Sequence, residues 1–222
     1  MLIRFFDIFF SLIAFLLLSP LFLIVSIALK FSGEGEIFYF QPRIGKDKKI
    51  FYIIKFVTML KNSASMSLGT ITVKNDPRIL SVGKILRKTK INELPQLINI
   101  LKGDMSFIGP RPQTKDSFDM FSLKDQKIIT TTMPGLSGIG SIIFRNEEEL
   151  LNNASNAHLF YEHVIAPYKG NLERWYIENK TIFIYILLIL LTVWVVVFPK
   201  SKLPWKLFNL PRPSVKLKKL LI

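Results

Sequence analysis

One apolar segment near the start of the chain constrains the fold more than any other feature. The run Phe5–Leu29 covers 25 residues and carries a single charge, at Asp7. As one helix it reaches about 38 Å, at about 1.5 Å per residue, which is enough to cross a hydrocarbon core of roughly 30 Å. A secretory signal peptide fits poorly, because the run is too long and only Arg4 precedes it as a charged side chain. We therefore expect the segment to lie in a membrane.

A Ser–Pro pair just past the middle of this run leaves two arrangements open. Proline lacks a backbone donor and clashes with the carbonyl four residues earlier, which is that of Leu16. The hydroxyl of Ser19 is well placed to satisfy a group that Pro20 frees. The helix can span the membrane with a kink, or it can break and return so that both ends lie on one face. Composition alone favours the spanning helix.

A second uncharged run, Thr181–Phe198, has 18 residues. This borderline length allows it to span the membrane, to lie in the interface or to form a buried core helix. The tail after Pro199 carries seven basic residues and no acidic ones, which are Lys200, Lys202, Lys206, Arg212, Lys216, Lys218 and Lys219. Near an anionic leaflet, each adds roughly 1 kcal/mol of attraction.

The overall balance of charge points to anionic partners. The 222 residues include 30 Lys and Arg against 16 Asp and Glu, a net charge of +14, and half of the residues are hydrophobic. Such a chain suits an anionic membrane or phosphate-bearing substrates. No nucleic acid is expected, because neither aromatic RNP strands nor zinc-finger spacing is present. The absence of cysteine excludes a disulfide framework and Cys-ligated metals, and His158 and His163 alone do not indicate a metal site.

The region between the two apolar runs, about residues 31–180, has the punctuation of a globular domain. Ile37–Gln41 and Lys49–Phe56 predict two strands that form a hairpin. Apolar spacing predicts helices over Ile79–Arg87 and Ile91–Leu101.

Five basic side chains precede Glu93 in the sequence. They are Arg78, Lys84, Arg87, Lys88 and Lys90. Such a run is commonly a solvated face. Beside a lone carboxylate and close to a membrane, it can equally clamp a diphosphate. The residues alone leave both interpretations open.

Two further turns bear on phosphate binding. Arg111 lies between Pro110 and Pro112, and the stiff backbone can present the guanidinium fork to a phosphate. Taken alone, a rigid surface turn is the simpler interpretation. The glycine-rich turn Pro134–Gly140 matches neither a Walker nor a Rossmann fingerprint, so nucleotide binding by those modes is not supported.

A series of short motifs occurs in one order over nearly the whole chain. They are Arg4–x–x–Asp7 with Ser19–Pro20, Gln41–Gly45, Lys55–Phe56–x–Thr58–Met59, Asp76–Ile79, Leu86–Thr89, Glu93–Leu97, Gly103–Ser106, Gly109–Pro112, Pro134–Gly135–x–x–Gly138 and Trp175–Tyr176. Together they make the chain resemble the bacterial sugar transferase family of monotopic polyprenyl-phosphate phosphoglycosyl transferases.

The resemblance implies an α-rich α+β fold in three parts. Residues 1–30 are expected to form a re-entrant helix–break–helix in the membrane, with the break at Ser19–Pro20. This element anchors a cytoplasm-facing globular domain with a small β-hairpin, over residues 31–180. Residues 181–222 form an interfacial apolar helix and a basic tail. The resemblance thus reverses the preference for a spanning helix, and it implies the cytoplasmic face of the bacterial inner membrane.

The resemblance also implies the reaction. A nucleotide diphosphate sugar, expected to be a UDP-sugar, gives its sugar-1-phosphate to polyprenyl phosphate and releases a nucleoside monophosphate, with Mg²⁺ as cofactor. This step starts capsule, exopolysaccharide or other surface glycan assembly. The implied catalytic residues are Glu93 and Asn92, the phosphate- or nucleotide-binding residues are Arg78, Arg87, Lys88 and Arg111, and Asp104 supports them. No metal ligand is assigned.

The match fails at the position of greatest chemical importance. Family members use an Asp–Glu pair in which the Asp is the nucleophile, and here that position is Asn92. A neutral amide is a very poor nucleophile. Glu93 can itself attack, the lipid phosphate can attack directly with electrostatic help from Glu93, or the chain can be an inactive relative that binds lipid or partner enzymes. The other charges of the site are present, which favours activity. Val57 and Tyr185 also depart from an expected Arg and an expected acidic residue.

Overall fold

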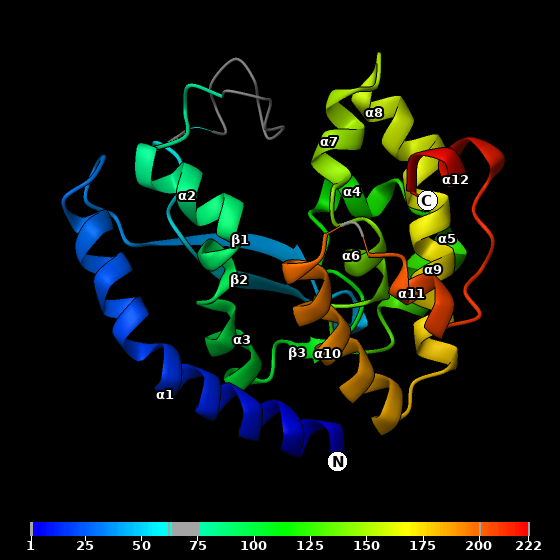
Figure 1. Cartoon of the computed structure of the whole chain (residues 1–222), viewed down its shortest axis with the longest axis horizontal. Helices are drawn as coiled ribbons and strands as arrows, with labels where there is room; N and C mark the ends of the chain where they lie inside the picture. The colour runs from blue at the N-terminus through cyan, green and yellow to red at the C-terminus, as the bar shows by residue number, and fades with distance from the viewer. Residues whose placement is uncertain (1, 62, 64–75, 200, 222) are drawn as a thin grey trace. The chain divides into compact units, whose positions relative to one another are not determined.

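The computed structural model describes residues 2–61, 63, 76–199 and 201–221. It is rich in helix, with a small hairpin and an apolar N-terminal helix, and it confirms the predicted fold class at that level (Figure 1). The chain forms two compact units. Unit 1 comprises residues 1–7, 43–51 and 103–222, and unit 2 comprises residues 8–42 and 52–102. The predicted division at residues 30 and 180 concerns placement in a membrane and stays a prediction.

The elements follow in chain order. The first half contains α1 (Leu2–Lys30), β1 (Phe38–Ile44), a 3₁₀ turn (Lys46–Lys48), β2 (Ile50–Phe56), α2 (Ser81–Thr89), a second 3₁₀ turn (Ile91–Glu93), α3 (Gln96–Lys102) and β3 (Ser106–Ile108). The second half contains α4 (Lys115–Asp119), α5 (Leu123–Ile129), β4 (Gly135–Ser137), α6 (Ile139–Ile143), α7 (Glu147–Asn152), α8 (Ala157–Phe160), a π-helical turn (Tyr161–Ile165), α9 (Ala166–Glu178), α10 (Ile182–Val197), α11 (Leu203–Leu207) and α12 (Val215–Leu221).

Helix α1 continues through the Ser–Pro pair, so the predicted break is not an interruption of the helix. Pro20 lies inside the helix, and the hydroxyl of Ser19 donates to the carbonyl of Leu16 at 2.8 Å. That carbonyl is the one whose usual partner proline cannot provide, so the predicted compensation by Ser19 is present. The helix changes direction part-way along its length (Figure 1). By length and composition, α1 is the one helix among the described residues that could cross a membrane.

The core of unit 2 joins α1 to α2 and the hairpin. Phe22, Val25 and Leu29 lie on one face of α1 and pack with Phe56 of β2 and Leu86 of α2. The rings of Phe22 and Phe56 lie 5.4 Å apart between centroids. The apolar side chains of α1 therefore fall into two groups. Those on this face are buried in the protein, while many of the others are exposed.

The local predictions hold for the hairpin and for α2, and in part for the helix expected over Ile91–Leu101. That segment is a 3₁₀ turn followed by the shorter helix α3. Pro95 has no backbone N–H to donate to the carbonyl of Ile91, and the N–H of Leu94 donates to that carbonyl instead at 3.1 Å, which tightens the turn. Helix α3 is held to the hairpin by Asn99, whose Oδ1 accepts from the N–H of Ile54 at 2.9 Å and whose Nδ2 donates to the carbonyl of Tyr52 at 2.8 Å.

Unit 1 contains a parallel strand pair that no sequence pattern predicted. Strands β3 and β4 pair with Ser106 opposite Gly135 and Ile108 opposite Ser137. The two backbones approach closely beyond the pair, since a Cβ added at Gly135 would lie 2.1 Å from the nitrogen of Gly109. Only glycine fits at position 135, because any side chain would collide with the backbone of Gly109. The glycine-rich turn therefore packs directly against the Gly109–Pro112 turn.

The second apolar run forms helix α10, which packs against the core of unit 1. One face, with Tyr185, Leu188, Leu191 and Val195, is buried in the core of unit 1. The other face leaves large apolar side chains exposed, including Phe183 at 73%. At 16 residues the helix reaches about 24 Å, short of the roughly 30 Å needed to span a bilayer. It is a core helix with an apolar outer face.

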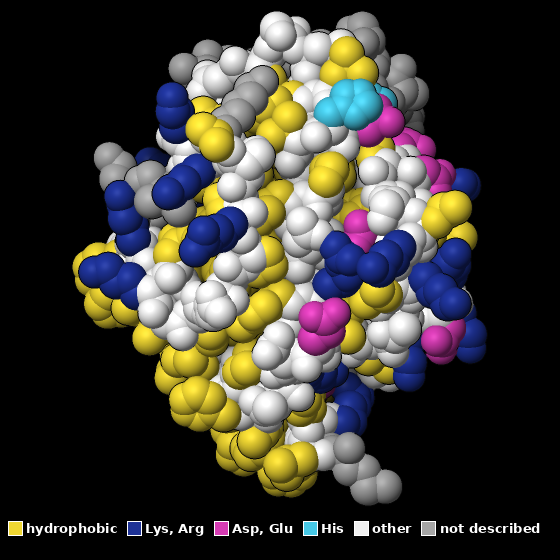
Figure 2. All heavy atoms as spheres, turned by 90° about the vertical axis from the view of Figure 1, so that its right-hand side faces the viewer, with side chains coloured by type: hydrophobic (Ala, Val, Ile, Leu, Met, Phe, Trp, Pro, Cys, Tyr) yellow, Lys and Arg dark blue, Asp and Glu magenta, His cyan; other side chains and the backbone are white. Residues whose placement is uncertain are grey.

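The basic tail is folded onto the same unit. Leu217 of α12 is fully buried, and the hydroxyl of Tyr168 on α9 donates to the carbonyl of Pro211 at 2.7 Å. Figure 2 shows Lys and Arg side chains spread among apolar ones on the side of the molecule where α9 and α12 lie. Lys200 of the tail lies outside the described residues.

Candidate functional site

The carboxylate of Glu93 is held by a lysine that the site prediction did not include. Oε1 of Glu93 lies 3.2 Å from Nζ of Lys55, with side-chain exposures of 17% and 15%. Lys55 lies on the apolar strand β2, and Glu93 lies at the end of the 3₁₀ turn that precedes α3. The sequence did contain a sign of this contact. Lys55 is the one charged residue of an otherwise apolar strand, and such a charge is rarely buried without a partner. The pair is partly buried, so solvent screens it only in part.

Asn92 precedes Glu93 and is 8% exposed. Its Oδ1 is buried and makes no hydrogen bond within the described structure. A buried acceptor without a partner costs about 1–3 kcal/mol. The site therefore holds a carboxylate beside an amide oxygen that can still accept a donor or a cation.

Arg78 is committed to a structural ion pair. Its Nε and Nη2 donate to the two carboxylate oxygens of Asp76 at 2.9 and 2.6 Å, and its Nη1 donates to the carbonyl of Ser63 at 2.6 Å. The guanidinium is buried, and this forked geometry is the strongest that Arg makes with a carboxylate. In this arrangement Arg78 braces the segment before α2, and its predicted role in phosphate binding stays a prediction.

Arg87 and Lys88 lie in the last turn of α2. Lys90 follows in a left-handed conformation, with φ of 62°, and turns the chain directly into Ile91–Glu93. The N–H of Glu93 donates to the carbonyl of Lys90 at 3.1 Å. The structure thus brings Glu93, Asn92, Lys55 and the basic end of α2 into one unit, as the diphosphate clamp requires.

Arg111 and Asp104 belong to unit 1 and not to the unit that holds Glu93. The turn that carries Arg111 is held on both sides. The N–H of Arg111 donates to Oε1 of Glu173 at 3.5 Å, and Nε2 of Gln113 donates to the carbonyl of Arg111 at 3.0 Å. The expected rigidity of the turn therefore comes from these contacts as well as from its prolines.

A buried charged cluster in unit 1 was not predicted. Lys169 and Glu173 of α9 are each 2% exposed, and Nζ of Lys169 pairs with a carboxylate oxygen of Glu147. Burial raises the pKa of Glu173 to about 7, against the opposing effect of Lys169 and Arg111. In sequence, a Lys and a Glu one helical turn apart are typical of a solvated surface pair, so nothing local marks their burial.

Asp7 is another buried carboxylate of unit 1. Its Oδ1 accepts from the hydroxyl of Ser106 at 2.9 Å, the N–H of Phe107 at 2.9 Å and the hydroxyl of Tyr185 at 2.7 Å. These donors come from β3 and α10, so Asp7 ties the start of α1 to both elements.

Comparison with known proteins decides the family. The model of the bacterial sugar transferase family matches residues 1–199. This chain belongs to that family. The sugar transferase is 37% identical over 158 residues to the exopolysaccharide production protein ExoY of Sinorhizobium fredii, covering 65% of this chain and 70% of ExoY.

Two longer relatives match more of the chain. One is the UDP-N-acetylgalactosamine-undecaprenyl-phosphate N-acetylgalactosaminephosphotransferase of Aeromonas hydrophila, 32% identical over 189 residues, which are 84% of this chain and 41% of the relative. The other is the undecaprenyl-phosphate galactose phosphotransferase of Salmonella typhimurium, 30% identical over 193 residues, which are 81% of this chain and 37% of the relative.

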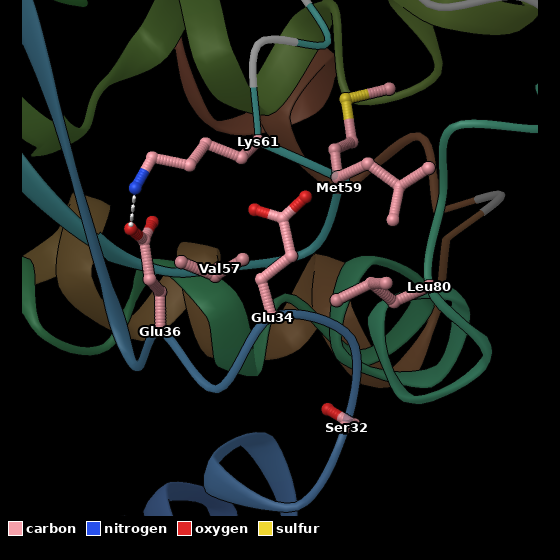
Figure 3. A pocket seen from close by; sticks show the side chains of 8 residues that line it. Ser32, Glu34, Glu36, Val57, Met59, Lys61 and Leu80 are labelled. Carbon is pink, nitrogen blue, oxygen red and sulfur yellow. Dashed lines mark hydrogen bonds and ion pairs between the residues drawn. The ribbon is translucent and has the colours of Figure 1, made fainter.

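The structure shows the surroundings of Tyr185 and Val57, the two residues at which the resemblance predicts other side chains. In this sugar transferase, Tyr185 donates to Asp7, where a second carboxylate would repel the first. Val57 lines a small pocket just after the C-terminal end of α1, together with Glu34 and Glu36 (Figure 3). Lys61 places a cation in this pocket, where its Nζ lies 2.7 Å from Oε1 of Glu36.

Proposed function

We propose that this sugar transferase moves a sugar-1-phosphate from a nucleotide diphosphate sugar, a UDP-sugar, to polyprenyl phosphate, and so starts the assembly of an exopolysaccharide, capsule or related surface glycan. Family membership and the activities for which the relatives are named support the reaction. The observation that carries it is the Glu93 carboxylate, held by Lys55 next to Asn92, whose buried Oδ1 has no hydrogen-bond partner among the described residues, just after the basic end of α2.

We assign the reactive carboxylate to Glu93. Its attack on the sugar-bearing phosphorus would break the bond to the bridging oxygen and release the nucleoside monophosphate. An oxygen of polyprenyl phosphate would then displace Glu93, so that the sugar phosphate ends on the lipid as a diphosphate. Lys55 orients the carboxylate, while Arg87 and Lys88 offer positive charge to the phosphate oxygens. Arg111 is proposed to bind phosphate and Asp104 to support it, as the resemblance implies.

Mg²⁺ fits the oxygen atoms present. This ion binds through one or two carboxylates together with substrate phosphates, and it seldom needs a cage made by protein alone. The Glu93 carboxylate and the Asn92 Oδ1 would hold it, the latter because it is buried and has no hydrogen-bond partner in the described part of the chain. When bound, Mg²⁺ neutralises the charge of the diphosphate.

We further propose that α1 is the re-entrant anchor and that the enzyme works at the cytoplasmic face of the bacterial inner membrane. The support is the bend in α1 and the Ser19 bond to the freed Leu16 carbonyl. The apolar outer face of α10 and the basic tail would add contact with an anionic leaflet. Cysteines introduced at Leu2 and Ser32 are expected to label from one side of the membrane, and labelling from opposite sides would refute the re-entrant arrangement.

The test of activity uses membranes that contain the protein, a panel of labelled UDP-sugars, polyprenyl phosphate and Mg²⁺. We expect lipid-linked sugar and release of UMP, with activity lost in Glu93→Gln and retained in Glu36→Gln, a change of an exposed acid in the same unit. Failure of every sugar would favour the alternative of a catalytically inactive, membrane-associated scaffold.

Omitting the lipid separates the mechanisms. UMP released without polyprenyl phosphate, in an amount near that of the enzyme, is expected if Glu93 is the nucleophile. No release without lipid would instead indicate direct attack by the lipid phosphate. Asn92→Asp restores the carboxylate pair of the family and is expected to raise the rate.

A further inference from the structure

Helix α9 presents a row of polar side chains to the turn that carries Arg111. Glu173 contacts the Arg111 N–H, and the hydroxyl of Tyr176, three residues later, donates to the carbonyl of Ile108 at 3.1 Å. One face of one helix therefore holds the backbone on both sides of Gly109–Pro110. Because Glu173 and Tyr176 are both buried, the contact is shielded from water.

The position of the Glu173 carboxyl is shaped by its surroundings. A Cβ added at Gly140 of α6 would lie 2.3 Å from its Oε1 and 3.5 Å from the Cγ of Lys169. A side chain at position 140 would thus displace the carboxyl. The second oxygen, Oε2, is buried and makes no hydrogen bond among the described residues. A carboxyl kept in such a place at an energetic cost is unusual for a group that only fills space.

We propose that Glu173 is a positioning residue for Arg111, and that through this contact α9 sets how the Arg111 guanidinium meets the diphosphate of the nucleotide sugar. The proposal rests on the proposed function. Glu173 does not touch the substrate. It acts through the backbone of the turn and through its charge beside Arg111.

The charged groups around Glu173 come from several elements. Lys169 lies one turn earlier on α9, Arg111 lies on the turn, Glu147 on α7 pairs with Lys169, and Tyr161 faces Lys169 from the π-helical turn, its ring centroid 5.6 Å from Nζ. Burial raises the pKa of Glu173 to about 7. Ionisation above that pH would place a negative charge beside Arg111 and weaken its attraction for a diphosphate.

The experiment combines Glu173→Leu and Glu173→Gln with Arg111→Ala in a double-mutant cycle. Glu173→Leu is expected to raise the KM for the UDP-sugar about tenfold, with a smaller change in the KM for polyprenyl phosphate. In the Arg111→Ala background the same change should have little further effect. Independent, additive effects would overturn the proposal, as would an equal loss toward both substrates. Asp119→Asn, an exposed acid of the same unit, is the control.

Glu173→Gln keeps the shape of the side chain and an acceptor oxygen for the Arg111 N–H, so it tests the charge with a smaller change in packing than Glu173→Leu. We expect near wild-type activity below pH 7, and no weakening of UDP-sugar binding as the pH rises to 8. A profile like that of the wild type would overturn the charge effect.

Titration of the purified protein with UDP separates this inference from the proposed function. If the wild type transfers no sugar but binds UDP, with Glu173 and Arg111 coupled in binding, the transferase proposal fails and the positioning proposal stands. If UDP binding is unaffected by Arg111→Ala, the positioning proposal fails.

Discussion

Replacing Glu173 by glutamine should change how stability depends on pH. The folded protein holds the proton of Glu173 up to a pKa of about 7, whereas the ordinary value is 4.5. Between these values the folded state binds more protons than the unfolded state, so raising the pH lowers the free energy of unfolding. At about 1.4 kcal/mol per pH unit, the wild type loses about 3 kcal/mol between pH 4 and pH 8 through this group. Glutamine cannot ionise and escapes the loss.

Thermal unfolding in detergent between pH 4 and pH 8 measures the effect. The Tm of Glu173→Gln relative to that of the wild type should increase between pH 4 and pH 8, by roughly 6–12 °C for a chain of this size. Asp119→Asn, whose carboxylate is exposed, should follow the wild type at every pH. A constant difference between Glu173→Gln and the wild type across the whole range would refute the reasoning, because it would mean that Glu173 titrates alike in the folded and unfolded states.

Three further substitutions test the contacts described above. Asp7→Leu leaves three donors without their acceptor and should lower the free energy of unfolding by about 3–5 kcal/mol. Ser11→Ala removes a buried hydroxyl that has no partner among the described residues, and it should cost nothing in the same denaturant titration. Similar losses for both variants would contradict the role of Asp7. Lys55→Met should abolish sugar-phosphate transfer while the Tm changes little, since the Glu93 pair is partly exposed, and an active variant would remove Lys55 from the site. Gly135→Ala forces a Cβ against the nitrogen of Gly109 and should cost about 1–3 kcal/mol, so an unchanged melting curve would argue against the close crossing of the two turns.

Local patterns in the sequence predicted local structure. The hairpin followed from its apolar strands and turn, and α2 from its helical spacing. The helix expected over Ile91–Leu101 was right for Gln96–Leu101 and wrong for its first turn, which is 3₁₀ because Pro95 has no N–H to donate to the carbonyl of Ile91. The bond from Ser19 to the Leu16 carbonyl was predictable since both lie within one helical turn of Pro20.

The parts that could not be predicted join residues far apart in the chain. Lys55 meets Glu93 across 38 positions, and Asp7 meets Tyr185 across 178. The parallel pairing of β3 with β4 likewise depends on tertiary packing. The roles of Glu93 and Asn92 stay predictions, because they depend on a substrate and not on the fold.

The route of the chain between its two units has a practical consequence. The backbone passes from one unit to the other at residues 7–8, 42–43, 51–52 and 102–103. Deleting the first 30 residues would remove Asp7 from unit 1, and Phe22, Val25 and Leu29 from the core of unit 2. The apolar helix is thus part of the folding core of both units as well as the proposed anchor. A trimmed, water-soluble form of this enzyme is therefore not expected to fold, and its purification will require detergent or lipid from the first step.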